Sequence, residues 1–154
     1  MTKLCSNVLT ALAGKTLVTA ESITGGCIGA ALTAVSGSSA VYKGGMISYT
    51  NWVKEHHLGV PGEMLETFGA VSAPVAEAMA KGARKALEAD VAVSVTGLAG
   101  PGGDEFGNPV GTVFIGYADE HTSFVRHFLF TGSREEIRSQ TAEAALSIVL
   151  EQNK

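Results

Sequence analysis

The chain has 154 residues, of which 45% are hydrophobic and 17% are charged. This length and composition predict one domain with a buried core, which excludes a disordered tail. The formal net charge is −4 and like charges form no block, so a nucleic-acid binder, which needs a basic stripe, is not expected. No apolar run reaches the roughly 18 residues that span a bilayer. The first residues lack a secretory signal pattern, so we expect a soluble cytoplasmic protein without a membrane partner.

Glycine is unusually frequent: 19 of 154 residues, or about 12% against a typical ~7%. The glycines gather at a few junctions, namely 25–26, 44–45, 97–103 and 107–111. Such clusters are typical of tight turns or of backbone that approaches a ligand closely. The composition therefore favours a small-molecule site.

The first half of the chain alternates between predicted helices and strands. Apolar spacing predicts helices at 4–12, 27–35 and 51–58, and strands at 16–20 and 46–49. Gly14 is placed to end the first helix. The helix at 27–35 is rich in alanine and has no polar face, which predicts burial and favours a subunit contact. We therefore expect a homodimer or a higher homo-oligomer.

The second half adds a hairpin. Ser72 as N-cap and Pro74 in the first turn open a helix that runs to Leu87. A strand follows at 90–96, and two strands at 110–118 and 123–131 are predicted to pair as a hairpin. The last helix opens with the capping-box pattern of Ser133 and Glu136 and runs to about 152. This order predicts a single α/β domain over 1–154, an α/β/α layered sandwich with a mixed sheet.

The segment 19–26 joins a strand to a helix start that carries two glycines. Ser22 lies there among free backbone N–H groups, which can stabilise an oxyanion or hold a phosphate. Spacing alone favours Ser22 as a helix cap, and Glu21 could be a structural carboxylate. Cys27 is interpreted as a small core residue.

A second candidate segment, 44–54, carries Tyr49 and Lys54 across a strand end. A lysine that is desolvated loses its proton more easily and can activate a serine hydroxyl. Either side chain could converge on a cleft or point to solvent. The chain contains neither a Ser-x-x-Lys nor a Gly-x-Ser-x-Gly motif, so ordinary hydrolase signatures are absent.

Two further segments could bind an anion. The loop 96–104 follows a buried strand and could form a nest of N–H groups around a phosphate or carboxylate, or a plain tight turn at Pro101. It matches neither the P-loop nor the Gly-x-Gly-x-x-Gly pattern. Arg134 and Arg138 share a helix face, where an arginine could bind phosphate bidentately or join a surface ion-pair lattice.

No metal is expected. The four histidines are not grouped with carboxylates, and the two cysteines have no metal-ligand spacing and are too few for a disulfide framework.

These segments occur in one order along nearly the whole chain and together resemble the C-terminal domain of the competence/damage-inducible protein CinA. The resemblance rests on these motifs: Thr-Ala-Glu-Ser-x-Thr-Gly-Gly at 19–26, Gly-Ser-Ser at 37–39, Ser-Tyr-Thr-Asn-x-x-Lys at 48–54, Gly-Ala-Val-Ser at 69–72, Thr-Gly-x-Ala-Gly-Pro-Gly-Gly at 96–103, Pro-Val-Gly-Thr-Val at 109–113 and Arg-Ser-Gln at 138–140.

The resemblance implies hydrolysis of the carboxamide of nicotinamide mononucleotide to nicotinate mononucleotide and ammonia, in pyridine-nucleotide salvage and without a cofactor. Larger members carry a further N-terminal domain, whose activity is not carried over. The resemblance implies Ser22, Tyr49 and Lys54 as catalytic residues. It implies these substrate-binding residues: Thr24, Gly25, Gly26, Ser39, Thr96, Gly97, Ala99, Gly100, Arg138 and Gln140.

The residue chemistry fits this expectation. Ser22 would attack the amide carbon while neutral Lys54, helped by Tyr49, takes its proton. The phosphate would lie near a glycine-rich nest or Arg138, and direct attack by water remains an alternative. A non-catalytic nucleotide-binding or regulatory module, and a serine–lysine amidase acting on other small amides, are the competing interpretations.

Overall fold

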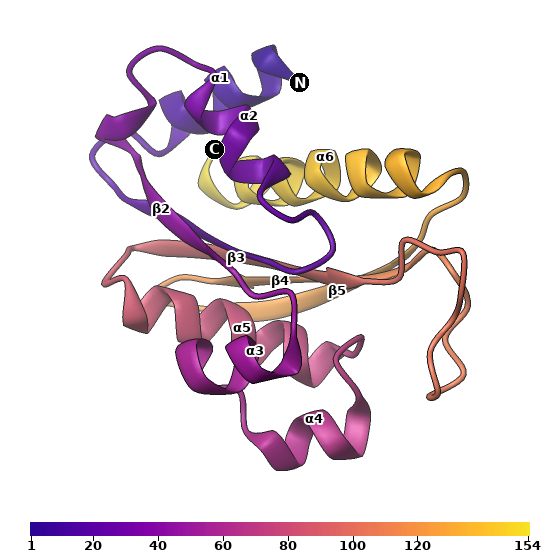
Figure 1. Ribbon diagram of the computed structural model, residues 1–154. Helices are drawn as coiled ribbons and strands as arrows, with labels where there is room; N and C mark the ends of the chain where they lie inside the picture. Colours follow the sequence, from indigo (N-terminus) through magenta and orange to yellow (C-terminus); the bar gives the residue numbers. More distant parts are fainter.

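A five-stranded mixed sheet forms the middle layer of the computed structural model, which describes residues 1–154 (Figure 1). Its strand order is β2-β1-β3-β4-β5. β2, β1 and β3 are parallel, whereas β4 runs antiparallel to both of its neighbours. The carboxyl ends of the three parallel strands therefore meet at one edge of the sheet. The strands are β1 (Leu17–Glu21), β2 (Tyr42–Ile47), β3 (Val91–Gly97), β4 (Thr112–Ala118) and β5 (Ser123–Leu129).

Helices cover both faces of this sheet (Figure 1). One face carries α1 (Thr2–Ala11), α2 (Cys27–Thr33) and α6 (Arg134–Asn153), and the other carries α3 (Asn51–Leu58), α4 (Gly62–Phe68) and α5 (Ala73–Ala86). A short 3-10 helix, η1 (Ser38–Ala40), precedes β2. Each face has its own cluster of buried apolar side chains. The predicted α/β/α sandwich with a mixed sheet is thus confirmed.

Several predicted elements are confirmed in detail. α3 has the predicted bounds, and β4 and β5 form the predicted hairpin. At the start of α6, Ser133 Oγ accepts from the Glu136 N–H at 3.1 Å and Glu136 Oε1 accepts from the Ser133 N–H at 2.9 Å, which is the predicted capping box. The helix predicted at 27–35 ends at Thr33 and is buried on one side only: Ile28 and Leu32 pack into the core, whereas Ala30 and Thr33 are exposed.

One predicted strand is misplaced, and one helix is missing from the predictions. The strand predicted at 46–49 lies instead at Tyr42–Ile47, because Gly44 and Gly45 are inside the strand and do not form a junction. A side chain on Gly45 would collide with Thr19 of the neighbouring β1, so the glycine serves close strand packing there. α4 was not predicted, because it has seven residues and buries only Leu65.

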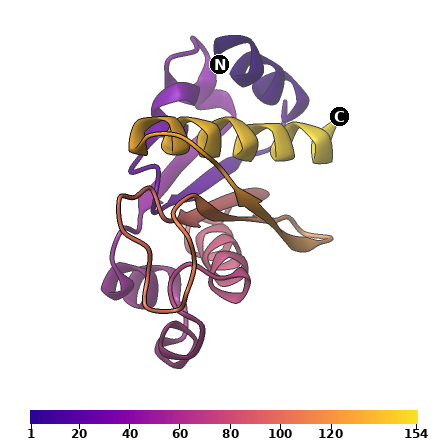
Figure 2. The same cartoon turned by 90° about the vertical axis from the view of Figure 1, so that its right-hand side faces the viewer.

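The glycine-rich loop 98–111 leaves the carboxyl end of β3 and descends beside the sheet toward the level of α4 (Figure 2). The Asn108 side chain donates to the Val71 carbonyl at 3.2 Å, and the Phe106 ring packs against Gly69. The loop is therefore fixed to the connection between α4 and α5. None of the helices combines the length and apolar character that crossing a membrane requires.

Candidate active site

Ser22 and Lys54 form a buried pair at the carboxyl edge of the parallel strands. Ser22 follows the last residue of β1, and Lys54 projects from α3, which follows β2. Lys54 Nζ donates to Ser22 Oγ at 2.9 Å. The same nitrogen also donates to the carbonyls of Ser48 at 2.8 Å and Tyr49 at 3.2 Å. All three ammonium donors thus have an acceptor.

Burial changes the acid–base behaviour of Lys54. The residue is 1% exposed and faces no carboxylate among its contacts. Desolvation by this burial lowers the pKa of Lys54 to about 8 from an ordinary 10.5. At pH 7 about a tenth of the molecules then carry a neutral amine, which can accept the proton of a serine hydroxyl. This arrangement suits activation of Ser22 as a nucleophile.

Ser22 and Lys54 open into a cavity of about 320 Å³, within the size range of small-molecule pockets. Arg134 is the only other charged residue that lines it, and no carboxylate does. Its walls come from the turn after β1, the start of α3, the α4–α5 connection, the loop after β3 and the start of α6. The lining residues are Ser22, Ile23, Tyr49, Lys54, Ala70, Val71, Thr96, Gly97, Leu98, Ala99, Gly100, Gly102 and Arg134.

Glu21, next to Ser22, has a structural role. Its Oε1 accepts from Thr24 Oγ1 at 2.8 Å and from the Ile28 N–H at 2.9 Å. Its Oε2 accepts from Thr19 Oγ1 and the Gly29 N–H, both at 3.0 Å. The carboxylate therefore ties the first turn of α2 to β1, and it is absent from the cavity lining.

Arg138 braces the same turn from α6. Its Nε donates to the Ile23 carbonyl and its Nη2 to the Thr24 carbonyl, both at 3.0 Å. Gly25 and Gly26 lie in this turn with φ of 59° and 112°, values that favour glycine. Four predicted substrate-binding residues, Thr24, Gly25, Gly26 and Arg138, are thus placed behind Ser22 and outside the cavity lining.

The other predicted residues divide into two groups. Thr96, Gly97, Ala99 and Gly100 line the cavity, and Thr96 Oγ1 donates to the Ala70 carbonyl at 2.8 Å. Ser39 is exposed and lies in η1, beyond the amino end of β2 and therefore at the opposite end of that strand from Ser22. Gln140 donates to the carbonyls of Thr131 and Glu136 and does not line the cavity.

Tyr49 lines the cavity, but the residue is 60% exposed. Its hydroxyl lies 3.3 Å from Arg134 Nη2, whereas its backbone carbonyl is the group that accepts from Lys54. The family resemblance implies Arg138 and not Arg134 as a substrate-binding residue. Spacing puts both arginines on one helix face and offers either as a phosphate ligand, and the structure shows that Arg134 is the one that lines the cavity.

A larger, acidic groove of about 870 Å³ adjoins the cavity and shares Ala70, Val71 and Leu98 with it. Trp52, His56 and Phe106 supply aromatic rings to its walls. The groove also carries four carboxylates and no lysine or arginine. They belong to Glu55, Glu66, Asp104 and Glu105.

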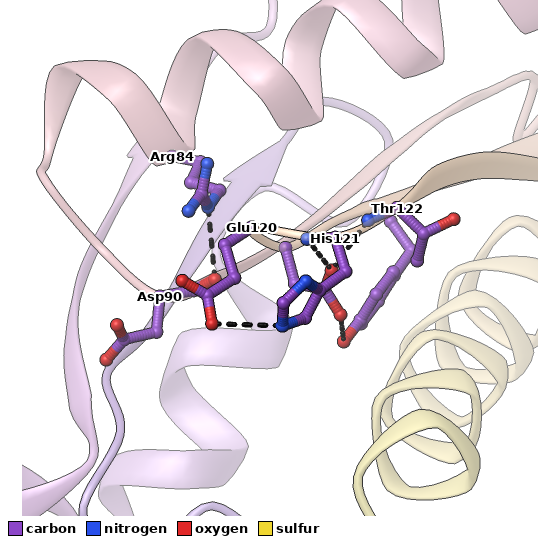
Figure 3. Close-up of polar contacts among 7 residues, drawn as sticks. Arg84, Asp90, Glu120, His121 and Thr122 are labelled. Carbon is purple, nitrogen blue, oxygen red and sulfur yellow. Dashed lines mark hydrogen bonds and ion pairs between the residues drawn. The ribbon is translucent and has the colours of Figure 1, made fainter.

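A polar hollow of about 370 Å³ lies at the opposite end of the sheet, beside the β4–β5 turn. Figure 3 shows Arg84 Nε donating to the Asp90 carbonyl at 3.1 Å, and His121 beside Glu120 at 3.1 Å. Three cationic side chains and two carboxylates line the hollow, and none of its residues also lines the cavity that contains Ser22. Across the chain, no group of three or more His, Cys, Asp and Glu side chains is placed to hold a metal ion.

Fold and site together define an α/β domain with a buried serine–lysine pair at the carboxyl edge of its parallel strands. The CinA C-terminal domain family matches residues 1–153, and the chain belongs to that family. The chain is 50% identical over 134 residues to a CinA-like protein of Geotalea daltonii, a match that covers 87% of this chain and 32% of the relative. A CinA-like protein of Parasynechococcus marenigrum is 58% identical over 102 residues, covering 66% and 24%. The chain thus spans about a third or less of the length of these relatives.

Solved structures of the superfamily match the whole domain. The competence/damage inducible protein from Agrobacterium tumefaciens is 40% identical, with a TM-score of 0.95 over 99% of this chain and 95% of that one. A competence-damaged protein (CinA) superfamily protein from Klebsiella pneumoniae is 33% identical, with a TM-score of 0.95 over 98% and 96%. The architecture described above is therefore the architecture of this superfamily.

Proposed function

We propose that the chain is a nicotinamide-nucleotide amidase that converts nicotinamide mononucleotide to nicotinate mononucleotide and ammonia, as a step of pyridine-nucleotide salvage. The observation that carries the proposal is the 2.9 Å contact between Lys54 Nζ and Ser22 Oγ inside the cavity. A nucleophile and a depressed-pKa base in hydrogen-bond contact are what amide hydrolysis needs. A module that only binds a nucleotide needs neither.

In the first step, Ser22 Oγ attacks the carboxamide carbon while the neutral amine of Lys54 accepts the hydroxyl proton. The electron-withdrawing pyridinium ring makes this carbon more electrophilic than that of a peptide amide. The N–H of Ile23 has no hydrogen-bond partner within the chain and belongs to the residue next to the nucleophile. It is the group we assign to stabilising the oxyanion.

Collapse of the tetrahedral intermediate breaks the C–N bond. The Lys54 ammonium returns its proton to the departing nitrogen, ammonia leaves, and Ser22 carries the acyl group of nicotinate mononucleotide as an ester, with the ribose phosphate still on the ring nitrogen. Water then attacks the ester with Lys54 again as base, which releases the carboxylate and restores the serine hydroxyl. Atoms balance over the two steps, since one water is consumed and one ammonia is released.

The test is ammonia release from nicotinamide mononucleotide by the wild type, by Ser22→Ala, and by the control Ser36→Ala, which alters an exposed serine in a loop. We expect release by the wild type and the control, and release at the uncatalysed background in Ser22→Ala. Mass spectrometry of a rapidly quenched reaction is expected to find the peptide that contains Ser22 esterified with the acyl group of nicotinate mononucleotide. Binding of the nucleotide without any release by the wild type would contradict the proposal and favour a binding module.

A further inference from the structure

Arg134 lies at the mouth of the cavity and spans its two rims. Its Nη1 donates to the Gly100 carbonyl at 2.6 Å, and its Nη2 lies 3.3 Å from the Tyr49 hydroxyl. Gly100 belongs to the loop after β3, and Tyr49 follows β2. The guanidinium has five N–H donors in a fixed fork, so these two contacts hold it in place and leave donors unused.

The charges around the cavity distinguish its two ends. Among the lining residues, Lys54 is buried against Ser22 and has all its donors satisfied, so Arg134 is the one exposed cation. At the opposite side, past Ala70 and Val71, the cavity adjoins the groove with four carboxylates. A phosphate would be repelled at the groove and attracted at Arg134.

The neighbouring arginine cannot serve the same purpose in this arrangement. Arg138 spends its Nε and Nη2 on the carbonyls of Ile23 and Thr24, and its side chain does not line the cavity. The N–H groups of Ala99 and Gly100 have no hydrogen-bond partner within the chain, and both residues line the cavity near Arg134. Backbone donors of this kind complement a guanidinium at an anion site.

We infer that Arg134 anchors the phosphate of the substrate and thereby makes the site select phosphorylated over unphosphorylated nicotinamide nucleosides. This inference rests on the proposed function, whose reaction it refines. The fork geometry suits bidentate contact with a phosphate. The contact is made equally in the ground state and the transition state, so it is expected to act on KM more than on kcat.

The experiment compares the wild type with Arg134→Gln, Arg134→Lys and the control Arg126→Gln. The control removes a surface arginine of β5 that forms an ion pair with Glu151 of α6. Each is assayed with nicotinamide mononucleotide and with nicotinamide riboside. Arg134→Gln is expected to raise KM for the mononucleotide about 10–100-fold, with a smaller change in kcat. KM for the riboside is expected to stay within about twofold of the wild type, and Arg134→Lys is expected to fall between the two. Inorganic phosphate is expected to inhibit the wild type competitively and Arg134→Gln much more weakly.

Binding measured by calorimetry separates the two possible failures. An unchanged KM and unchanged affinity for the mononucleotide in Arg134→Gln would overturn the assignment of Arg134 while the amidase stands. An equal loss in Arg126→Gln would also overturn it, because a general field effect would then explain the result. If the wild type hydrolyses neither compound, the amidase fails. The inference then stands if the wild type binds the mononucleotide and Arg134→Gln binds it at least tenfold more weakly, and falls otherwise.

Discussion

Consecutive residues at the end of β1 have opposite surroundings. Glu21 has four donors around its carboxylate, which leaves it no acceptor capacity for a ligand. Arg138 closes the same turn from α6 and does not line the cavity. Ser22 has a single side-chain partner, Lys54, and faces a cavity. The side of the turn whose polar groups are saturated fixes the backbone, and the other side keeps reactive groups available to a ligand. Preorganisation of this kind is what a catalytic site requires.

The largest expected effect comes from removing Lys54, the proposed general base beside Ser22. Lys54→Met keeps the length of the side chain but has no proton acceptor, so we expect ammonia release to fall by roughly 10²–10⁴-fold. The control Lys85→Met alters an exposed lysine near the end of α5 and is expected to leave the rate unchanged. A Lys54→Met variant with more than about a tenth of wild-type kcat would contradict the role of Lys54 as general base.

Titration of Lys54 is expected to make both kcat/KM and the free energy of unfolding depend on pH. Because burial lowers the pKa of Lys54 to about 8, kcat/KM is expected to rise about tenfold per pH unit below pH 8 and to level off above it. In the unfolded chain Lys54 regains its ordinary pKa of 10.5, so the unfolded state binds more protons between pH 8 and 10.5 and the free energy of unfolding rises there. Below pH 8 the buried charge costs the native state about 3 kcal/mol.

Lys54→Met lacks this contribution. Relative to the variant, the wild type is therefore expected to gain about 2–3 kcal/mol of unfolding free energy between pH 7 and pH 10, as measured by urea denaturation. Subtracting the variant removes the contributions of other titrating groups. An equal difference at both pH values would mean that Lys54 titrates as an ordinary surface lysine, and the proposed base would lose its physical support.

A smaller effect is expected on the saturated side. Glu21→Gln keeps the shape of the side chain but turns one acceptor into a donor, which then faces donors from Thr19, Thr24 and α2. We expect a loss of about 2–3 kcal/mol in stability, a fall in Tm of roughly 4–12 °C for a domain of this size. A displaced turn would also lower kcat, by about tenfold. The matched control Glu66→Gln changes an exposed glutamate on α4 and is expected to leave Tm unchanged. A Tm within about 1 °C of the wild type would contradict the role of the Glu21 carboxylate in holding the first turn of α2 to β1.

Sequence patterns predicted most of the fold because apolar periodicity and capping residues act locally. The bounds of α3 and the capping box at Ser133 depend on neighbouring residues only. The glycine pair at 44–45 predicts a junction, wrongly, because the need for Gly45 comes from its close approach to Thr19 of β1, a strand more than 20 residues away. Propensity along the chain does not reveal how closely two strands approach.

The candidate site shows the same limit at the level of single side chains. Spacing places Arg134 and Arg138 on one helix face, but four residues separate them, which is about 6 Å along the helix axis. That displacement carries one guanidinium to the cavity mouth and the other to the back of the turn. The spacing predicts that the two arginines share a helix face. It does not predict which of them reaches the cavity, because that depends on how α6 packs on the sheet.

The smallest expected effect is on stability, from substituting Ser48. It tests whether a buried hydroxyl in the site lacks a hydrogen-bond partner. The hydroxyl of Ser48 is fully buried and has no hydrogen-bond partner, although the backbone carbonyl of the same residue accepts from Lys54. Ser94 is equally buried, but its hydroxyl donates to the Ala76 carbonyl at 2.6 Å. Removing an unpaired buried hydroxyl relieves a desolvation cost, whereas removing a paired one leaves an acceptor unsatisfied. We therefore expect the two alanine substitutions to have opposite signs.

Thermal unfolding of Ser48→Ala is expected to show stability equal to the wild type or up to about 1 kcal/mol higher, and Ser94→Ala is expected to lose about 1–2 kcal/mol. If both variants lose the same amount, the Ser48 hydroxyl has a partner in solution, for which an ordered water bridging it to the site would be the natural candidate. In that case the polar groups on the Ser22 side of the turn would have more hydrogen-bond partners than their direct contacts within the chain imply. Glu21 and Ser22 would then differ only in that Ser22 faces the cavity and Glu21 does not.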